Sequence, residues 1–392
     1  MQVKVRLSKS IVGPEEAAAA SRVILENGFF GMSREVQAFE RELAEFIGNG
    51  REVTCVSAAT AALHLALQAC GIGPGDEVLV PTITYVATFQ AVTASGATPV
   101  ACEVLRDTSW LDVEDAARRI TPRTRAIIPV HYASGTGDIA AVRELARKHN
   151  LRVIEDAAHA FGCTYEGKPI GATGDVVCFS FQGTKNITSG EGGAVVTADP
   201  AVAERIRDLR LLDVLKDTEN RYRQERSWEF DVVEQGWRYH MSDLFAAIGR
   251  VQLQRFEREF KPRRVALAKR YSSLLAGLDQ VRVLPLEYGS IVPHIYPIYI
   301  EDGRRDAVRE ALACEGIETG IHYKPNHLLT LYGGGEACLP VAEQLYREML
   351  TLPLHPALTE HQQDEVVAIV RRVVEGRAIP SHRGRRAVAV RA

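Results

Sequence analysis

Short apolar strands alternate with helices through the first half of the chain, and this alternation limits the possible folds more than any other feature. The expected strands are 53–56, 77–81, 98–104, 125–132 and 151–158, and the helices between them include 59–71, 85–96 and 138–150. Consecutive parallel strands are joined by right-handed crossovers through helices. The sequence therefore predicts an α/β fold whose central sheet is mostly parallel and covered by helices on both faces.

The length of 392 residues indicates two domains. We expect a large α/β domain over residues 1–250, including an N-terminal helical arm. A long helix beginning near residue 242 should lead into a smaller α/β domain over 251–376. The tail 377–392 contains five arginines and is expected to be solvated and disordered.

Charge and cysteine usage exclude several classes of protein. The net charge of −3 provides no basic surface for nucleic acid. Seven scattered cysteines without a CxxC pair indicate reduced thiols, with neither a disulfide framework nor a zinc site. The first residues lack the apolar core of a signal peptide, and no apolar run is long enough to span a membrane. We expect a cytoplasmic protein that binds neither nucleic acid, membrane nor metal.

Polar and aromatic residues follow the carboxyl ends of the expected strands. In an open α/β sheet, ligands bind at this edge. The residues are Ser57 to Thr60, Thr82 to Tyr85, His131 with Tyr132, Asp156 to His159, Ser180 and Lys185. Lys185 is the most unusual of them, because it lies just past an apolar strand, among hydroxyls and glycines, with no acidic neighbour in sequence.

Each of these residues has an ordinary structural explanation when it is taken alone. Ser57 and Thr60 are typical helix caps, and Asp156 could cap the helix that follows it. A lone Tyr85 or His131 is usual in a core, and a lone lysine usually lies in solvent. One ligand explains the whole set: it has a phosphate, a flat ring, a ring atom that pairs with a carboxylate, and an aldehyde that reacts with lysine. That ligand is pyridoxal 5′-phosphate (PLP).

The chemistry of PLP needs these residue types. A free lysine amine has a pKa of about 10.4 and is normally protonated, whereas a Schiff base makes lysine a covalent anchor. A carboxylate beside the pyridine nitrogen keeps that nitrogen protonated, so that the ring accepts electrons. Small residues at a helix N-terminus bind phosphate through free N–H groups and the helix dipole.

The chain resembles the DegT/DnrJ/EryC1/StrS sugar aminotransferases, a branch of the fold-type I, aspartate aminotransferase-like PLP enzymes. The resemblance runs from about Ile11 to Val374 and is strongest at 26–48, 57–88, 155–197, 236–253 and 320–327. The lysine-containing stretch FSFQGTKNITSGEGGAVV is its most specific part. The resemblance implies a fold-type I architecture, in which residues 1–250 bind PLP.

The resemblance also implies a role for each matching residue. Lys185 matches the lysine that bonds to PLP and then moves protons, and Asp156 matches the partner of the pyridine nitrogen. The remaining matches are Tyr85 on the ring face, His159 beside the ring hydroxyl, Ser180 with Ala59 and Thr60 around the phosphate, and His322 and Tyr323 where substrate enters.

One stretch departs from the family pattern. Relatives commonly have GYNYRMSD, whose Asn reaches the cofactor phosphate of the neighbouring subunit, whereas this chain has GWRYHMSD. Arg238 therefore stands where Asn is usual, and His240 where Arg is usual. Arginine is also a good phosphate ligand. The resemblance thus implies a homodimer whose active sites are shared between chains, with Arg238 at the phosphate.

The resemblance implies transfer of an amino group from L-glutamate to a nucleotide-linked keto sugar, with 2-oxoglutarate as co-product and pyridoxamine phosphate (PMP) as the intermediate form of the cofactor. Relatives that act at C3 often have HYPxPxH, whereas this chain has HYKPNH at 322–327, which favours C4 of a dTDP-linked 4-keto-6-deoxyhexose. The alternatives are amination of a cyclitol ketone or a C3-keto sugar, a PMP-dependent sugar dehydratase, and a non-catalytic PLP-binding regulator. Lys185 argues against the dehydratase, whose relatives have histidine at this position.

Overall fold

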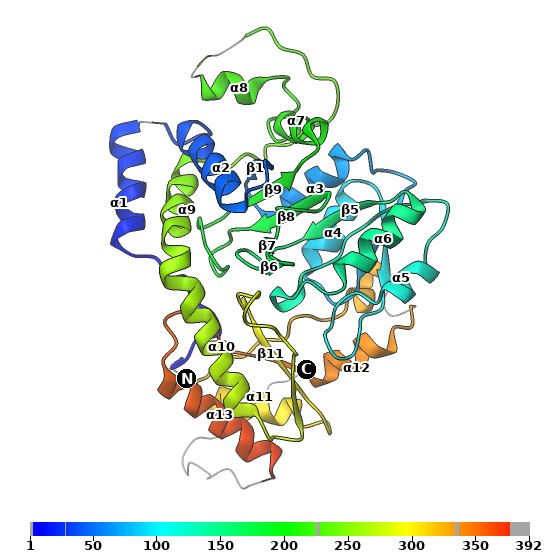
Figure 1. Cartoon of the computed structure of the whole chain (residues 1–392), viewed down its shortest axis with the longest axis vertical. Helices are drawn as coiled ribbons and strands as arrows, with labels where there is room; N and C mark the ends of the chain where they lie inside the picture. Colours follow the sequence, from blue (N-terminus) through cyan, green and yellow to red (C-terminus); the bar gives the residue numbers. More distant parts are fainter. Residues whose placement is uncertain (1–2, 28, 224, 226–227, 334–336, 377–392) are drawn as a thin grey trace.

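The computed structural model describes residues 3–27, 29–223, 225, 228–333 and 337–376. The expected disordered tail, 377–392, lies outside the described residues. Among the described residues, no helix has both the length and the apolar character needed to cross a bilayer. Figure 1 shows a larger part built around one sheet, above a smaller part that contains β11, α10, α11 and α13.

The large sheet has the strand order β1-β9-β8-β5-β4-β2-β3 in the described part of the chain. Its strands are β1 (Glu52–Val56), β2 (Glu77–Pro81), β3 (Thr98–Cys102), β4 (Thr124–Ile127), β5 (Arg152–Asp156), β8 (Val176–Ser180) and β9 (Gly193–Thr197). From β8 to β3 every neighbouring pair is parallel, whereas β9 runs antiparallel to both β1 and β8. The prediction of a mostly parallel α/β sheet is confirmed.

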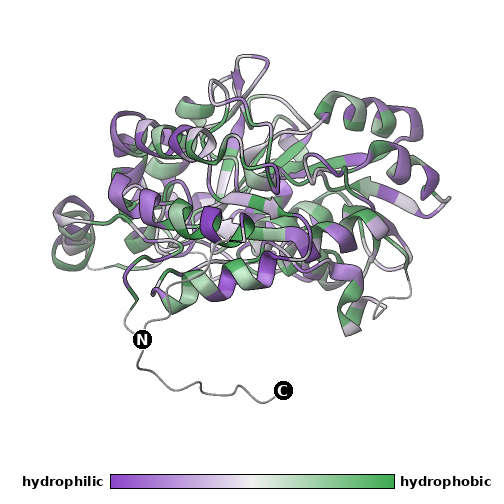
Figure 2. Ribbon diagram, turned by 90° about the horizontal axis from the view of Figure 1, so that it is seen from below, coloured by the Kyte–Doolittle hydropathy of each residue, from purple (hydrophilic) through white to green (hydrophobic). Residues whose placement is uncertain are grey.

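Helices cover both faces of this sheet (Figure 1). They are α2 (Arg34–Ile47), α3 (Ala59–Ala69), α4 (Val86–Ala94), α5 (Val113–Arg118), α6 (Ile139–His149) and α7 (Pro200–Leu209). Helix α8 (Asp217–Tyr222) lies beyond α7, away from the sheet (Figure 1), and Tyr132–Ser134 form a short 3-10 turn, η2. In α2 the buried residues Val36, Phe39, Leu43 and Ile47 recur at helical spacing, as in an amphipathic helix. Figure 2 shows the resulting mixture of hydrophobic and hydrophilic residues along the outer helices.

Strand β8 and the turn after it place Lys185. All five residues of β8 are buried, and its carboxyl end lies beside that of β5, where Cys178 pairs with Asp156. The chain then leaves the sheet for a turn before it returns as β9. Because strand β8 is central in the sheet, the residues just beyond it lie at the middle of the ligand-binding edge.

The smaller part is built around a three-stranded antiparallel sheet. The strands of this sheet are β10 (Val281–Val283), β11 (Tyr296–Ile300) and β12 (Met349–Leu352). The helices of the smaller part are α10 (Lys261–Leu275), α11 (Arg305–Cys314), α12 (Pro340–Glu348) and α13 (Glu360–Val374), with short turns η4 (Asn326–Leu328) and η5 (Thr330–Tyr332). The larger part also contains a separate hairpin of β6 (Thr164–Tyr165) and β7 (Lys168–Pro169).

A nearly continuous helical stretch joins the two parts. It consists of α9 (Asp243–Arg255), the π-helix η3 (Phe256–Phe260) and α10, and it passes through residue 250 without a break. Helix α1 (Pro14–Arg22), followed by the π-helix η1 (Val23–Asn27), lies beside α9 (Figure 1). Before α1, Val5 pairs with Ile317 of the smaller part. The division at residue 250 stays a prediction.

One expected element differs from the structure. The strand expected over 125–132 is shorter as β4, because Pro129 has no N–H to donate to a sheet and Tyr132 begins a 3-10 turn.

Candidate active site

Lys185 lies in the turn after β8, and several main-chain contacts hold that turn. Its N–H donates to the carbonyl oxygen of Gln182 at 2.9 Å. The next side chain, Asn186, is buried and donates to the carbonyl oxygens of Phe161 and Val292, both at 3.0 Å. The lysine is therefore presented from a rigid turn that is tied to both parts of the molecule.

The surroundings of Lys185 lower the pKa of its amine from 10.5 to about 8. Burial is the main cause, because it disfavours the charged form, and the Arg264 guanidinium acts in the same direction. The carboxylate of Asp156 opposes them by favouring the ammonium. An appreciable fraction of the amine is therefore uncharged near neutral pH, as a nucleophile or a base requires.

Asp156 ends β5, and its carboxylate is held in one orientation. The side chain is buried, with Oδ2 accepting a hydrogen bond from Thr88 Oγ1 at 2.8 Å and Oδ1 accepting from the N–H of Ala158 at 3.1 Å. Thr88 is in turn 2.9 Å from the hydroxyl of Thr84. These contacts fix a buried negative charge at the strand ends without a direct ion pair to Lys185.

Aromatic and imidazole side chains surround the lysine and the carboxylate. Nε2 of His159 lies 3.1 Å from the hydroxyl of Tyr323, and the rings of His159 and His294 are 4.5 Å apart. Burial lowers the pKa of both histidines well below the usual value, so both are neutral at neutral pH. Burial also raises the pKa of Tyr323, which keeps its phenol protonated.

Tyr85 is exposed at this site. It precedes α4 as its N-cap residue, and 59% of it is exposed although the strand before it is fully buried. Its ring centroid is 5.6 Å from that of Tyr323. An exposed tyrosine ring at the carboxyl edge of the sheet is a suitable surface for stacking a flat ligand ring.

Small residues form a cradle where β1 turns into α3. The N-cap residue Ala58 has no side chain that could cap the first N–H groups of the helix, which begins with Ala59 and Thr60. Gly193 packs so closely against this turn that an added Cβ would lie 2.7 Å from the main chain of Ala58 and Ala59. Ser180, buried at the end of β8, is the partner of Gly193 across the sheet.

These residues fit PLP. The helix N-terminus and a nearby serine suit a phosphate, Tyr85 suits the ring, and the fixed carboxylate of Asp156 suits a pyridinium nitrogen. Among the described residues, Nδ1 of His159 has no hydrogen-bond partner although it is buried, so its ring retains unused bonding capacity beside Lys185.

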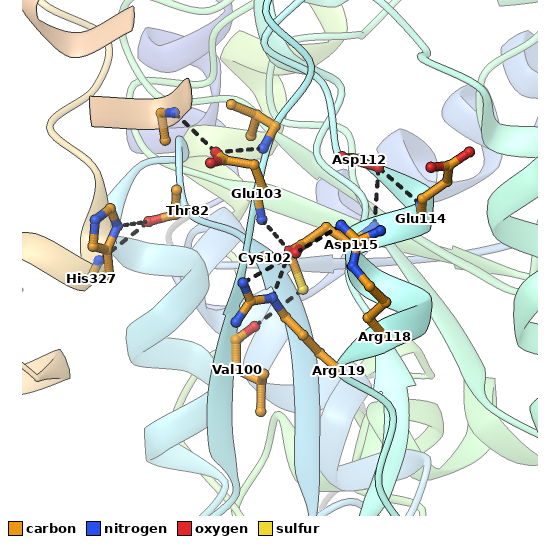
Figure 3. A network of polar contacts seen from close by, with 12 residues as sticks. Thr82, Val100, Cys102, Glu103, Asp112, Glu114, Asp115, Arg118, Arg119 and His327 are labelled. Carbon is orange, nitrogen blue, oxygen red and sulfur yellow. Dashed lines mark hydrogen bonds and ion pairs between the residues drawn. The ribbon is translucent and has the colours of Figure 1, made fainter. Parts of the chain in front are cut away.

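The smaller part supplies His322 and Tyr323, and contacts with the larger part place them. Figure 3 shows Thr82 and His327 facing one another, with Thr82 Oγ1 2.8 Å from Nδ1 of the imidazole. The buried amide of Asn326 also donates to the carbonyl oxygens of Thr82 and Thr84. His322 itself lies 2.9 Å from the hydroxyl of Thr351 through Nδ1, and burial lowers its pKa to about 4.

Glu103 forms a second connection between the two parts (Figure 3). Its carboxylate accepts hydrogen bonds from the N–H groups of Val341 and Ala342, in the first turn of α12, at 3.0 and 2.9 Å. A carboxylate at a helix N-terminus satisfies free N–H groups and favours the helix dipole. The segment that contains Tyr323 is therefore flanked by contacts that hold the two parts together.

Arg238 lines a different cavity in the single chain. It is exposed, and this cavity of about 810 Å³ is also lined by His240 but by neither Lys185 nor Asp156. The main chain beside Arg238 reaches the cradle, because the carbonyl oxygen of Tyr239 accepts a hydrogen bond from the N–H of Ser57 at 2.6 Å.

The structure brings six of the predicted site residues together: Lys185, Asp156, His159, His322, Tyr323 and Tyr85. It places Ser180, Ala59 and Thr60 around the cradle at the neighbouring strand ends. Arg238 belongs to the other cavity.

Three further residues of the site were missed in the sequence. Thr88 and Arg264 lie inside helices, where a threonine or an arginine has no distinguishing pattern. His294 precedes the apolar strand β11, and its position is revealed only when the smaller part folds against Lys185. His131, expected at the ligand edge, is instead buried and paired with Glu155 at 2.9 Å.

Known proteins resemble this chain along nearly its whole length. The model of the DegT/DnrJ/EryC1/StrS aminotransferase family matches residues 12–371. The spore coat polysaccharide biosynthesis protein SpsC of Bacillus subtilis (strain 168) is 36% identical over 380 residues, which cover 94% of this chain and 97% of SpsC.

Solved structures of other proteins also resemble this chain over nearly its whole length. S. venezuelae DesV is 40% identical, with a TM-score of 0.83 and coverage of 92% of this chain and 94% of DesV. The PLP-form of Spr1654 from Streptococcus pneumoniae is 29% identical, with a TM-score of 0.87 and coverage of 96% and 99%. A PMP-form of Spr1654 has a TM-score of 0.88.

Proposed function

The chain belongs to the DegT/DnrJ/EryC1/StrS aminotransferase family, and on this premise we propose that it transfers an amino group from L-glutamate to a keto sugar carried on a nucleotide. It is a PLP-dependent sugar aminotransferase with the fold of its structural neighbours. The proposal concerns the donor, the nucleotide and the sugar. We also propose a cytoplasmic location, supported by seven cysteines that are all unpaired.

One observation carries the assignment of Lys185 as the reacting amine, on which the proposal depends. The amine of Lys185, with its pKa lowered to about 8, lies among a fixed carboxylate, neutral imidazoles and an exposed tyrosine ring, at the carboxyl edge of a parallel sheet. A structural lysine would be exposed or paired with an acid. Here Lys185 is partly buried, and its nearest recorded side-chain contact is a neutral histidine.

We assign each residue one task. PLP, when bound, supplies an aldehyde that exchanges amino groups and a ring that accepts electron density. Lys185, partly buried, would remove a proton from the substrate carbon and deliver it to the cofactor carbon, because its amine can be neutral at working pH. Asp156, held by Thr88, would face the ring nitrogen and favour its protonated form. Tyr85 would stack on the ring, and His159 would lie near its hydroxyl.

The sugar should enter beside His322 and Tyr323. His322 is held by Thr351 of the smaller part, and Tyr323 contacts His159 beside Lys185, so a substrate that reaches the lysine would meet both side chains. A neutral imidazole and a protonated phenol suit the hydroxyls of a sugar, which both donate and accept. We favour C4 of a dTDP-linked 4-keto-6-deoxyhexose because the segment reads HYKPNH.

We further propose a homodimer in which Arg238 serves the partner's cofactor phosphate. The cavity that contains Arg238 lacks the other predicted site residues of its own chain. Phe29, Trp228 and Phe230 also line this cavity and are 42%, 85% and 62% exposed. An exposed apolar patch around an arginine is typical of a protein interface.

The test is a substrate panel. Purified enzyme is incubated with L-glutamate carrying isotope-labelled nitrogen and with dTDP-, GDP- or UDP-linked keto sugars or a cyclitol ketone, and products are identified by mass spectrometry. We expect one sugar nucleotide to acquire the labelled nitrogen with equal release of 2-oxoglutarate. Labelled nitrogen on a cyclitol ketone alone would replace the proposed substrate class, and a sugar that loses water without gaining nitrogen would indicate a dehydratase.

A further inference from the structure

His294 contacts the amine of Lys185 from the side of the smaller part. Its Nε2 lies 3.3 Å from Lys185 Nζ, and only 7% of the residue is exposed. The N–H of His294 donates to Ser134 Oγ at 3.0 Å, so the larger part fixes the main chain from which the ring projects. The contact between the imidazole and the amine therefore belongs to the folded framework.

Arg264 ties the main chains of these two residues together. Its guanidinium is 2% exposed and donates to the carbonyl oxygen of His294 at 3.3 Å and to that of Lys185 at 3.5 Å. A buried guanidinium that binds carbonyl oxygens of two segments fixes their separation. As a result, the side chains of Lys185 and His294 are brought together from two parts of the chain that are far apart in sequence.

The contact with the lysine fixes the tautomer of His294. A lysine ammonium has three donors and no acceptor, so the Nε2 atom at 3.3 Å must accept through its lone pair. The ring proton of a neutral imidazole is then on Nδ1, which is buried and has no hydrogen-bond partner among the described residues. His294 is also one of the residues that line a small cavity of about 40 Å³.

The charges around His294 keep its ring neutral. Burial lowers its pKa well below the usual value, and the groups that face it are Lys185, His159, Arg264 and His322, all of which act in the same direction. A neutral ring with its proton on Nδ1 can only accept a hydrogen bond through Nε2. The lysine amine must then be the donor in the 3.3 Å contact.

We propose that His294 is a positioning residue whose Nε2 accepts a hydrogen bond from the Lys185 amine and holds it at the edge of the site whenever it is not bonded to the cofactor. This inference rests on the proposed function only through the role of Lys185 as the reacting amine. It is independent of the sugar, the donor and the dimer.

The test measures the apparent pKa of the Lys185 amine in the full-length chain freed of cofactor. It therefore does not depend on any assay of amino transfer. Competitive labelling with acetic anhydride over a range of pH, followed by mass spectrometry of the Lys185 peptide, gives the apparent pKa of this amine. In the wild type we expect titration at about 8. His294→Leu should lower this pKa by about one unit, because an acceptor stabilises the ammonium more than the amine.

Two variants separate positioning from simple packing. His294→Gln keeps a side-chain oxygen that can accept from the amine, and it should restore the apparent pKa to within about 0.3 unit of the wild type. His64→Leu is the matched control, because His64 is also buried and packs on Trp237, away from Lys185. Equal titration of Lys185 in His294→Leu, His64→Leu and wild type would overturn the proposal.

A second measurement determines the tautomer of His294 in the wild-type protein. In the full-length chain with isotope-labelled histidines, nitrogen NMR should show His294 protonated at Nδ1 and unprotonated at Nε2. The His294 signals are assigned as those that disappear in the His294→Gln variant. Lys185→Met should shift the Nε2 signal, because it removes the donor. A proton on Nε2, or an Nε2 signal unaffected by Lys185→Met, would contradict the proposed contact.

Discussion

Replacing Gly193 by alanine should weaken PLP binding by disturbing the turn before α3. The added Cβ would lie 2.7 Å from the carbonyl carbon of Ala58 and the nitrogen of Ala59, and neither main-chain atom can rotate away as a side chain would. Such overpacking costs about 1–3 kcal/mol of folding free energy. Relief requires the first turn of α3 to move, and this turn carries the N–H groups that we assign to the phosphate.

The loss can be estimated from one phosphate contact. A hydrogen bond to a charged group contributes about 1.5–3 kcal/mol, so the Kd for PLP should rise about ten- to a hundredfold. Titration of cofactor-free protein with PLP, followed by absorbance, measures this Kd. Gly73→Ala is the matched control, because its Cβ would meet only the carbonyl oxygen of Ser95 at an ordinary 3.5 Å. Folded Gly193→Ala protein that binds PLP as tightly as Gly73→Ala would refute the phosphate assignment.

Three further predictions concern the other assigned residues. Asp156→Ala should slow the half-reaction with glutamate by a factor of about 10² or more, because the ring nitrogen loses its fixed charge; stopped-flow absorbance that shows a rate within a few-fold of wild type would exclude this role. Tyr85→Phe should keep PLP affinity and Tyr85→Ala should lower it, as measured by PLP titration, since stacking needs the ring and not the hydroxyl. Mixing inactive Lys185→Ala and Arg238→Glu proteins under subunit exchange should restore activity, because one site of each hybrid dimer is intact; hybrids without activity would place Arg238 at the site of its own chain.

The sheet could be predicted because the alternation of strands and helices permits few topologies. Strands β2 and β5 lead to residues of the site, and the parallel direction of β2, β4 and β5 follows from the helices between them. Strand β9 could not be oriented in this way. A run such as GAVVT reads alike in either direction, and the turn that contains Lys185 has no crossover helix to set its course.

The site could be predicted only in part, because the topology of the sheet places some of its residues and tertiary packing places the others. Lys185, Asp156 and Tyr85 follow strands, so the topology alone places them at one edge. Thr88 contacts Asp156 from inside a helix, where a threonine usually belongs to the core, and its role depends on the angle at which α4 packs. His294 and Arg264 belong to segments whose approach to Lys185 is set by tertiary packing between the two parts, which no local pattern encodes.

The most direct test of the central claim is to identify the lysine that bonds to PLP. Purified enzyme loaded with PLP is reduced with borohydride, digested, and the cofactor-bearing peptide is sequenced by mass spectrometry. We predict a single modified peptide, with the cofactor on Lys185, and a Lys185→Ala protein that still binds PLP but transfers no amino group. Cofactor fixed to another lysine, or full activity in Lys185→Ala, would contradict the assignment of Lys185 as the reacting amine.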